Sequence, residues 1–179
     1  MPFKFHFLII LIVLPILGCR TTIPPRDSVL PTFVFKIQGD GLNENITQDF
    51  DFDNSALNLR RGQRYRVVYT GADSGGLKEM TWRLPYSNIV GLGGQRGNFL
   101  YANSGDPYVN LYRYNGFTED PRTGASMTVQ AMVTHGGPLD GVVENYEFVF
   151  RVVDFHDNSI EKTLIVRITN APTAIVPRD

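Results

Sequence analysis

The chain has 179 residues, of which 42% are hydrophobic and 20% are charged. This is enough apolar material for a folded core, and the length suits one domain rather than a multidomain enzyme. Its 17 Lys and Arg residues nearly balance 18 Asp and Glu residues, so a strongly basic surface that binds nucleic acid non-specifically is not expected.

The first element along the chain has the features of an export signal. Lys4 is followed by an apolar run from Phe7 to Leu17. The run is too short to span a bilayer but has the length of a signal-peptide core. We therefore expect residues 1–18 to be a signal peptide that is removed from the mature protein.

The residues around the expected cleavage point are Ile16, Leu17, Gly18 and Cys19, which together resemble the lipobox of bacterial lipoproteins. Cys19 is the only cysteine, so this exported chain has one thiol, placed where a lipid would attach. The resemblance implies cleavage before Cys19 and anchoring by several acyl chains. Arg20 follows rather than Asp, which in this family implies the outer membrane of a Gram-negative bacterium. A stray cysteine at an ordinary cleavage site is the alternative.

The next segment has the composition of a linker. Residues 20–32 contain three prolines and show no apolar periodicity. We expect the lipidated Cys and a Pro-rich tether to occupy residues 19–32. At about 3.1 Å per residue in the polyproline II conformation, the tether would reach roughly 40 Å.

Apolar and polar residues alternate through the rest of the chain, as in half-buried strands. Turn-rich breaks separate the alternating segments, and none shows a sustained helical stripe. The pattern predicts an all-β fold, an antiparallel β-sandwich of about seven to nine strands over residues 33–170, followed by a C-terminal tail at 171–179. The clearest alternating segments are 33–37, 64–69, 79–84, 126–134, 146–152 and 163–168.

This layout is similar to immunoglobulin-like domains of bacterial surface proteins. Gly62 forms a turn that opens a strand, Trp82 lies on the next strand, and a hairpin from Tyr146 to Ile168 closes the domain. The cysteine pair that flanks the tryptophan in antibody domains is absent. The resemblance implies an immunoglobulin-like β-sandwich with a role in binding, adhesion or spacing.

Two acidic segments are candidates for calcium sites. Residues 49–54 alternate Asp and Phe, but the turn glycine of a calcium loop is absent and Arg60 stands where a bidentate Glu belongs. A strand with Phe50 and Phe52 inward is the favoured interpretation. Residues 153–158 are similar to the calcium-binding linker motif of cadherins, but they lie between two predicted strands, which favours a hairpin turn. We expect neither a metal site nor a cofactor.

The sequence gives little support for catalysis. The mature chain contains only His135 and His156, without the spacing of a zinc site. The glycine-rich segment 91–97 lacks the Lys and Ser or Thr of a phosphate loop. We therefore expect a protein that is not an enzyme.

A Gly- and Tyr-rich insert covers residues 90–126. On the strand predicted at 108–114, Val109 and Leu111 share one face and the tyrosines share the other. If the Val and Leu face packs inward, an outward row of tyrosines would suit protein or glycan recognition. The alternative is that the tyrosine face belongs to the core. The candidate binding residues are Tyr101, Tyr108, Asn110, Tyr112 and Tyr114.

Together these features predict a non-catalytic, lipid-anchored interaction module of the cell envelope. Its partners would be the membrane, through the anchor, and another envelope protein in an assembly. The alternative is a glycan-binding surface lipoprotein whose tyrosines stack on sugar rings.

Overall fold

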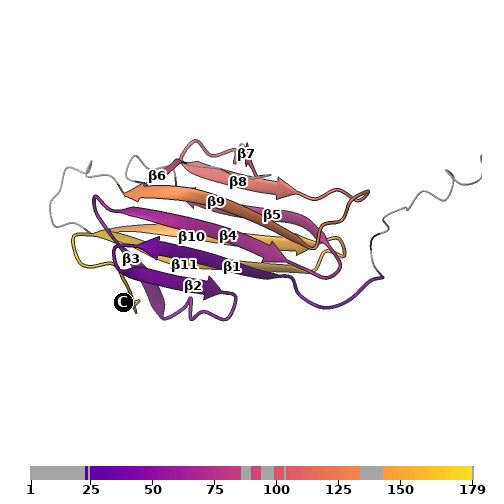
Figure 1. Cartoon of the computed structure of the whole chain (residues 1–179), viewed down its shortest axis with the longest axis horizontal. Coiled ribbons are helices and arrows are strands. Elements are labelled where there is room, and N and C mark those ends of the chain that lie inside the picture. The colour runs from indigo at the N-terminus through magenta and orange to yellow at the C-terminus, as the bar shows by residue number, and fades with distance from the viewer. Residues whose placement is uncertain are drawn as a thin grey trace, which may run out of the picture.

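The computed structural model describes residues 23, 25–85, 90–93, 99–102, 104–133 and 143–178. These residues form two β-sheets that pack face to face, with the strands running along the long axis of the molecule (Figure 1). The described chain enters at one end of this long axis. No helix in the described part of the chain is long and apolar enough to cross a membrane.

One layer is a five-stranded sheet in the order β2-β1-β4-β9-β6. Strict alternation explains why its strands pack on one face only. In β1, for example, Phe33, Phe35 and Ile37 are buried while Val34 between them is exposed. The strands are β1 (Thr32–Gly39), β2 (Leu42–Thr47), β4 (Arg64–Ala72), β6 (Val90–Gly93) and β9 (Gly124–Val133).

The second layer is a seven-stranded sheet in the order β12-β3-β11-β10-β5-β8-β7. The β3–β11 pair is parallel, and the other pairs of this sheet are antiparallel. The strands are β3 (Ser55–Arg60), β5 (Leu77–Pro85), β7 (Leu100–Ala102), β8 (Val109–Asn115), β10 (Glu144–Asp154), β11 (Ser159–Thr169) and β12 (Ala174–Pro177).

The strand order confirms the predicted all-β, immunoglobulin-like sandwich. The run β1-β4-β9 corresponds to strands A-B-E of an immunoglobulin domain, and β11-β10-β5-β8 corresponds to G-F-C-C′. Trp82 lies on β5, the C-strand position, and is fully buried. The described chain has twelve strands rather than seven to nine, because β6, β7 and β12 are short additions of three or four residues.

Aromatic side chains fill the space between the sheets. Phe35 of β1 reaches across to Phe150 and Trp82 of the other sheet, with ring centroids 4.7 and 5.6 Å apart. The Tyr69 hydroxyl, carried by β4, lies 3.2 Å from the carbonyl oxygens of Thr81 and Arg151 in the opposite sheet. This buried hydroxyl therefore ties the two layers together through their backbones.

The ordered domain extends beyond residues 33–170 at both ends. The Asn158 side-chain amide donates to the backbone carbonyl of Asp27 at 3.2 Å, so the chain is already held against the domain before β1 begins. At the other end, β12 pairs with β3, and the Arg178 amide donates to the carbonyl of Asn54 at 2.7 Å. Residues 174–177 of the expected tail therefore form a strand. The predicted signal peptide and Cys19 lie outside the described residues.

Candidate functional site

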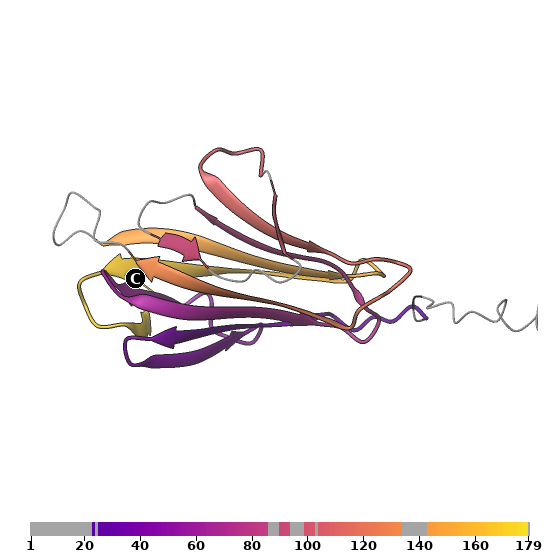
Figure 2. The same cartoon turned by 45° about the horizontal axis from the view of Figure 1, so that its top comes forward.

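The predicted tyrosine-rich surface lies on the β7–β8 hairpin, at one edge of the seven-stranded sheet. Its turn is fixed by local hydrogen bonds. The Tyr108 amide donates to the Asp106 carboxylate at 2.8 Å, and Ser104 Oγ lies 2.7 Å from the Asp106 carbonyl oxygen. In Figure 2 the tip of this hairpin projects away from the two packed layers. The hairpin therefore presents its turn residues to solvent on an ordered support.

The structure places two of the five candidate residues in the core. Tyr112 and Tyr114 are 4% and 2% exposed. The register with β5 sets Tyr112 opposite Trp82 and Tyr114 opposite Met80, both of which are fully buried. An outward tyrosine row is therefore wrong for Tyr112 and Tyr114, and the alternative that this face of β8 belongs to the core is correct.

The other tyrosines of the hairpin are on the surface. Tyr101 is 57% exposed and Tyr108 is 75% exposed, and neighbouring Leu100, which the sequence analysis missed, is 69% exposed. The rings of Tyr101 and Tyr112 form a T-shaped pair with a centroid distance of 5.9 Å, so the exposed Tyr101 packs against a buried side chain. Asn110 is half-buried. The run of three apolar residues at 99–101 is a sequence signal that could have pointed to Leu100.

On the outer face of the seven-stranded sheet, several charged side chains form ion pairs with one another. The Glu79 carboxylate of β5 forms two ion pairs. Its oxygens lie 3.2 Å from Nε of Arg113 on β8 and 2.7 Å from Nη1 of Arg151 on β10. Arg151 also lies 3.8 Å from Glu161 of β11. This chain of ion pairs runs across four neighbouring strands, so these four charges largely neutralise one another.

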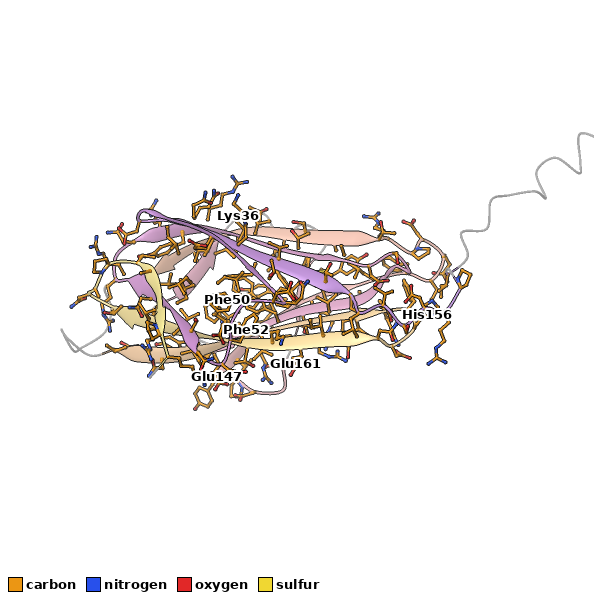
Figure 3. The ribbon with its side chains drawn as sticks, turned by 90° about the horizontal axis from the view of Figure 1, so that it is seen from below. Lys36, Phe50, Phe52, Glu147, His156 and Glu161 are labelled. Atoms are coloured by element: carbon orange, nitrogen blue, oxygen red, sulfur yellow. The ribbon has the colours of Figure 1, made fainter. Side chains whose placement is uncertain are left out.

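The Asp49–Asn54 segment is a turn rather than the predicted strand. It joins β2 to β3, and the Asp51 carboxylate accepts hydrogen bonds from the backbone and side-chain nitrogens of Asn54. Phe52 is buried and Phe50 packs against the core, as their alternation with exposed acids predicts. Figure 3 shows both rings between the sheets. The strand prediction fails because Asp51 and Asn54 close a turn through local hydrogen bonds.

A shallow hollow of about 530 Å³ lies beside this turn. Its charged lining combines four carboxylates with two cations, namely Asp51, Asp53, Glu147, Glu161, Lys162 and Arg178. Among the described residues, no three His, Cys, Asp or Glu side chains are grouped so that they could hold a metal ion.

The second acidic segment is the predicted hairpin turn between β10 and β11. The Asp154 carboxylate is buried and accepts hydrogen bonds from the amides of His156 and Asn158 and from the Asn158 side chain, so it shapes the turn. Asp73 and Asp27 lie nearby. Burial raises the pKa of Asp73, and the charges of Asp154 and Asp27 act in the same direction.

His135, the other histidine considered as a zinc ligand, lies outside the described residues, as do residues 94–97 of the glycine-rich segment 91–97. The first three residues of that segment, 91–93, belong to β6, which pairs with β9. The described part of this segment is therefore a strand at the sheet edge.

Comparisons with known proteins yield only distant structural likenesses. No protein-family model matches the chain, and no curated protein matches its sequence. A non-cellulosomal cohesin from Archaeoglobus fulgidus is similar with a TM-score of 0.38 and 12% identity, over 64% of this chain and 91% of the cohesin. The collagen-binding subdomain of the Enterococcus faecalis surface protein ACE is similar with a TM-score of 0.37 and 8% identity, over 68% of this chain and 99% of the subdomain. The human F-spondin reeler domain is similar with a TM-score of 0.34 and 14% identity, over 81% of this chain and 89% of the reeler domain. Such scores assign the chain to none of these families.

Proposed function

We propose that this chain is a non-catalytic, lipid-anchored interaction module of the cell envelope, which docks onto another envelope protein through the tip of the β7–β8 hairpin. The observation that carries the proposal is the exposure of Leu100, Tyr101 and Tyr108 on an ordered hairpin that stands out from the sandwich. Exposed aromatic side chains on a rigid support are typical of the residues that dominate protein interfaces.

The position of the hairpin suits a partner that approaches from above the membrane. The end of β8 lies near the point where the chain enters the domain, because Gly116 bonds to Lys78 just after the β4–β5 turn, and Asp27 packs beside Gly75 of that turn. Tyr108 lies at the start of β8, about 20 Å further along the strand direction. A lipid at Cys19 would therefore hold the opposite end of the domain at the outer membrane and leave the hairpin tip accessible.

The alternative function, glycan binding through the tyrosines, has less support from the structure. Two of the four hairpin tyrosines, Tyr112 and Tyr114, are buried and cannot stack on a sugar ring. Tyr101 and Tyr108 remain available, but they do not form a row on one strand face. A protein partner that covers the whole tip, with Leu100 included, is the better match to the exposed residues.

The test is crosslinking of the full-length chain in intact cells, followed by affinity recovery. Leu100→Ser together with Tyr108→Ser should lower recovery of a discrete partner about tenfold, because exposed anchor residues at interface centres each contribute more than about 1 kcal/mol. The matched control is Val29→Ser with Phe117→Ser, which removes two similarly exposed apolar side chains elsewhere. Unchanged recovery with the hairpin variant, or equal loss with the control, would refute the hairpin as the docking surface.

A further inference from the structure

In the described strands of the five-stranded sheet, the outward-pointing charged residues are all positive. Alternation along β1 and β4 directs Lys36, Arg64 and Arg66 away from the core, because their neighbours Phe35, Tyr65 and Val67 are buried. The remaining outward positions of β1, β2, β4 and β9 hold no Asp or Glu, and most of them are Thr, Ser, Asn, Gln or Val. We propose that this face binds an acidic polysaccharide.

The three cations lie close enough to act on one ligand. Lys36 pairs with Val68 and Arg66 pairs with Gln38, so Lys36 and Arg66 are diagonal neighbours about 7–8 Å apart on adjacent strands. Arg64 is two residues from Arg66 on the same strand and face, about 7 Å away. Their like charges repel one another, so an anion that lies across the row relieves an existing repulsion as well as forming new ion pairs.

Unlike Arg113 and Arg151 on the opposite face, these cations have no carboxylate partner in the described part of the chain. Arg113 and Arg151 on the other sheet share Glu79. Lys36, Arg64 and Arg66 form no ion pair with a described residue. The full chain has a formal net charge of −1, so three unpaired positive charges on one face make a strong local contrast. Such a contrast attracts polyanions from solution.

The other side chains of this face favour a sugar chain over an acidic protein. Protein interface cores are rich in aromatic residues and poor in Lys and Ser. Among the outward side chains that the structure describes, the only exposed large hydrophobic one is Val34, which is 37% exposed. The amides and hydroxyls of Gln38, Asn45 and Thr128 are instead suited to hydrogen bonds with sugar hydroxyls.

The orientation of the domain argues against an anionic lipid surface. The chain enters at one end of the long axis, whereas this face lies along the side of the sandwich (Figure 1). Figure 3 shows Lys36 on the opposite side of the sandwich from Glu147 and Glu161. A membrane at the entry end would therefore meet the turns at that end and not the row of cations.

The test uses the full chain in a non-ionic detergent and measures binding to polygalacturonate, with dextran as a neutral polysaccharide. Replacement of Lys36, Arg64 and Arg66 by Gln should weaken binding to polygalacturonate by about tenfold or more, and added salt should weaken binding of the unmodified chain. The matched control replaces Arg26, Arg83 and Arg122, three exposed cations outside this face, by Gln and gives the same change in net charge.

Each outcome decides the proposal. The proposal is supported if only the variant of Lys36, Arg64 and Arg66 loses binding to polygalacturonate and the unmodified chain does not bind dextran. An equal loss of polygalacturonate binding in both triple variants, or no binding of the unmodified chain to polygalacturonate, would overturn the proposal. Equal or tighter binding to poly-glutamate or to anionic phosphatidylglycerol vesicles would also overturn it, since the occupant would then be an acidic peptide or a lipid surface. None of these results depends on the hairpin, so the outcome is independent of the protein-docking proposal.

Discussion

Removal of the same hydroxyl from two buried tyrosines should have different effects on stability. The Tyr69 hydroxyl reaches the backbone carbonyls of Thr81 and Arg151, both at 3.2 Å, and links the two sheets. The Tyr114 hydroxyl is also buried but has no hydrogen-bond partner among the described residues. Tyr69→Phe therefore removes a satisfied hydrogen bond, while Tyr114→Phe removes a polar atom that was desolvated without compensation.

The magnitudes follow from these environments. Loss of the Tyr69 hydrogen bond should lower the free energy of unfolding by about 1–2 kcal/mol, which for a domain of this size lowers Tm by roughly 3–6 °C. Tyr114→Phe should leave the free energy of unfolding unchanged or raise it by up to about 1 kcal/mol, because no bond is lost and a buried polar group disappears.

The assay is urea unfolding of the unlipidated chain, with Cys19→Ala in every variant. Tyr108→Phe serves as the control, because this ring is exposed and its hydroxyl contacts solvent. A Tyr114→Phe variant that loses as much stability as Tyr69→Phe would refute the reasoning, since the two hydroxyls would then have equivalent partners.

Three further predictions concern acid stability, backbone packing and the anchor. The hydrogen bond from the Tyr146 hydroxyl holds the pKa of Glu144 below its ordinary value of 4.5, so this carboxylate contributes stability above pH 4.5 that is lost as the pH falls through the lowered pKa. Glu144→Gln should flatten that acid loss in urea unfolding, and an equally steep loss would contradict the assignment. Gly116→Ala should cost about 3 kcal/mol or more, because its Cβ would lie 1.9 Å from the Leu77 carbonyl oxygen, and a thermal unfolding curve like that of the unmodified chain would contradict this close approach. Cys19→Ala should move the chain from the detergent phase to the aqueous phase on phase partition, and unchanged partition would exclude this cysteine as the anchor.

The strand positions could be predicted because burial of one face leaves a clear period-two signal. Phe33, Phe35 and Ile37 on β1 and Tyr65 and Val67 on β4 are all buried, as their alternation predicts. The same signal gave the fold class. It missed β12, because residues 171–179 contain two prolines and show no long alternation, and only the pairing with β3 makes residues 174–177 a strand.

The candidate site was predicted less well because both faces of β8 are apolar. Val109 and Leu111 on one side and Tyr112 and Tyr114 on the other give equally good patterns for burial. Alternation divides such a strand into two faces but does not say which one packs inward. The register with β5, which sets Tyr112 opposite Trp82, makes that choice.

The outer face that carries Lys36, Arg64 and Arg66 shows the same division between what the sequence and the structure determine. The sequence alone sets Lys36 and Arg66 on the polar sides of their own strands, because each lies between residues that must be buried. Only the tertiary structure brings β1 and β4 together with both cations on one outer face, where neither forms an ion pair with a described residue. Local alternation is a property of a few consecutive residues and can be read from them. Strand pairing joins residues that are distant in sequence, and their relative position is fixed by how the whole core packs.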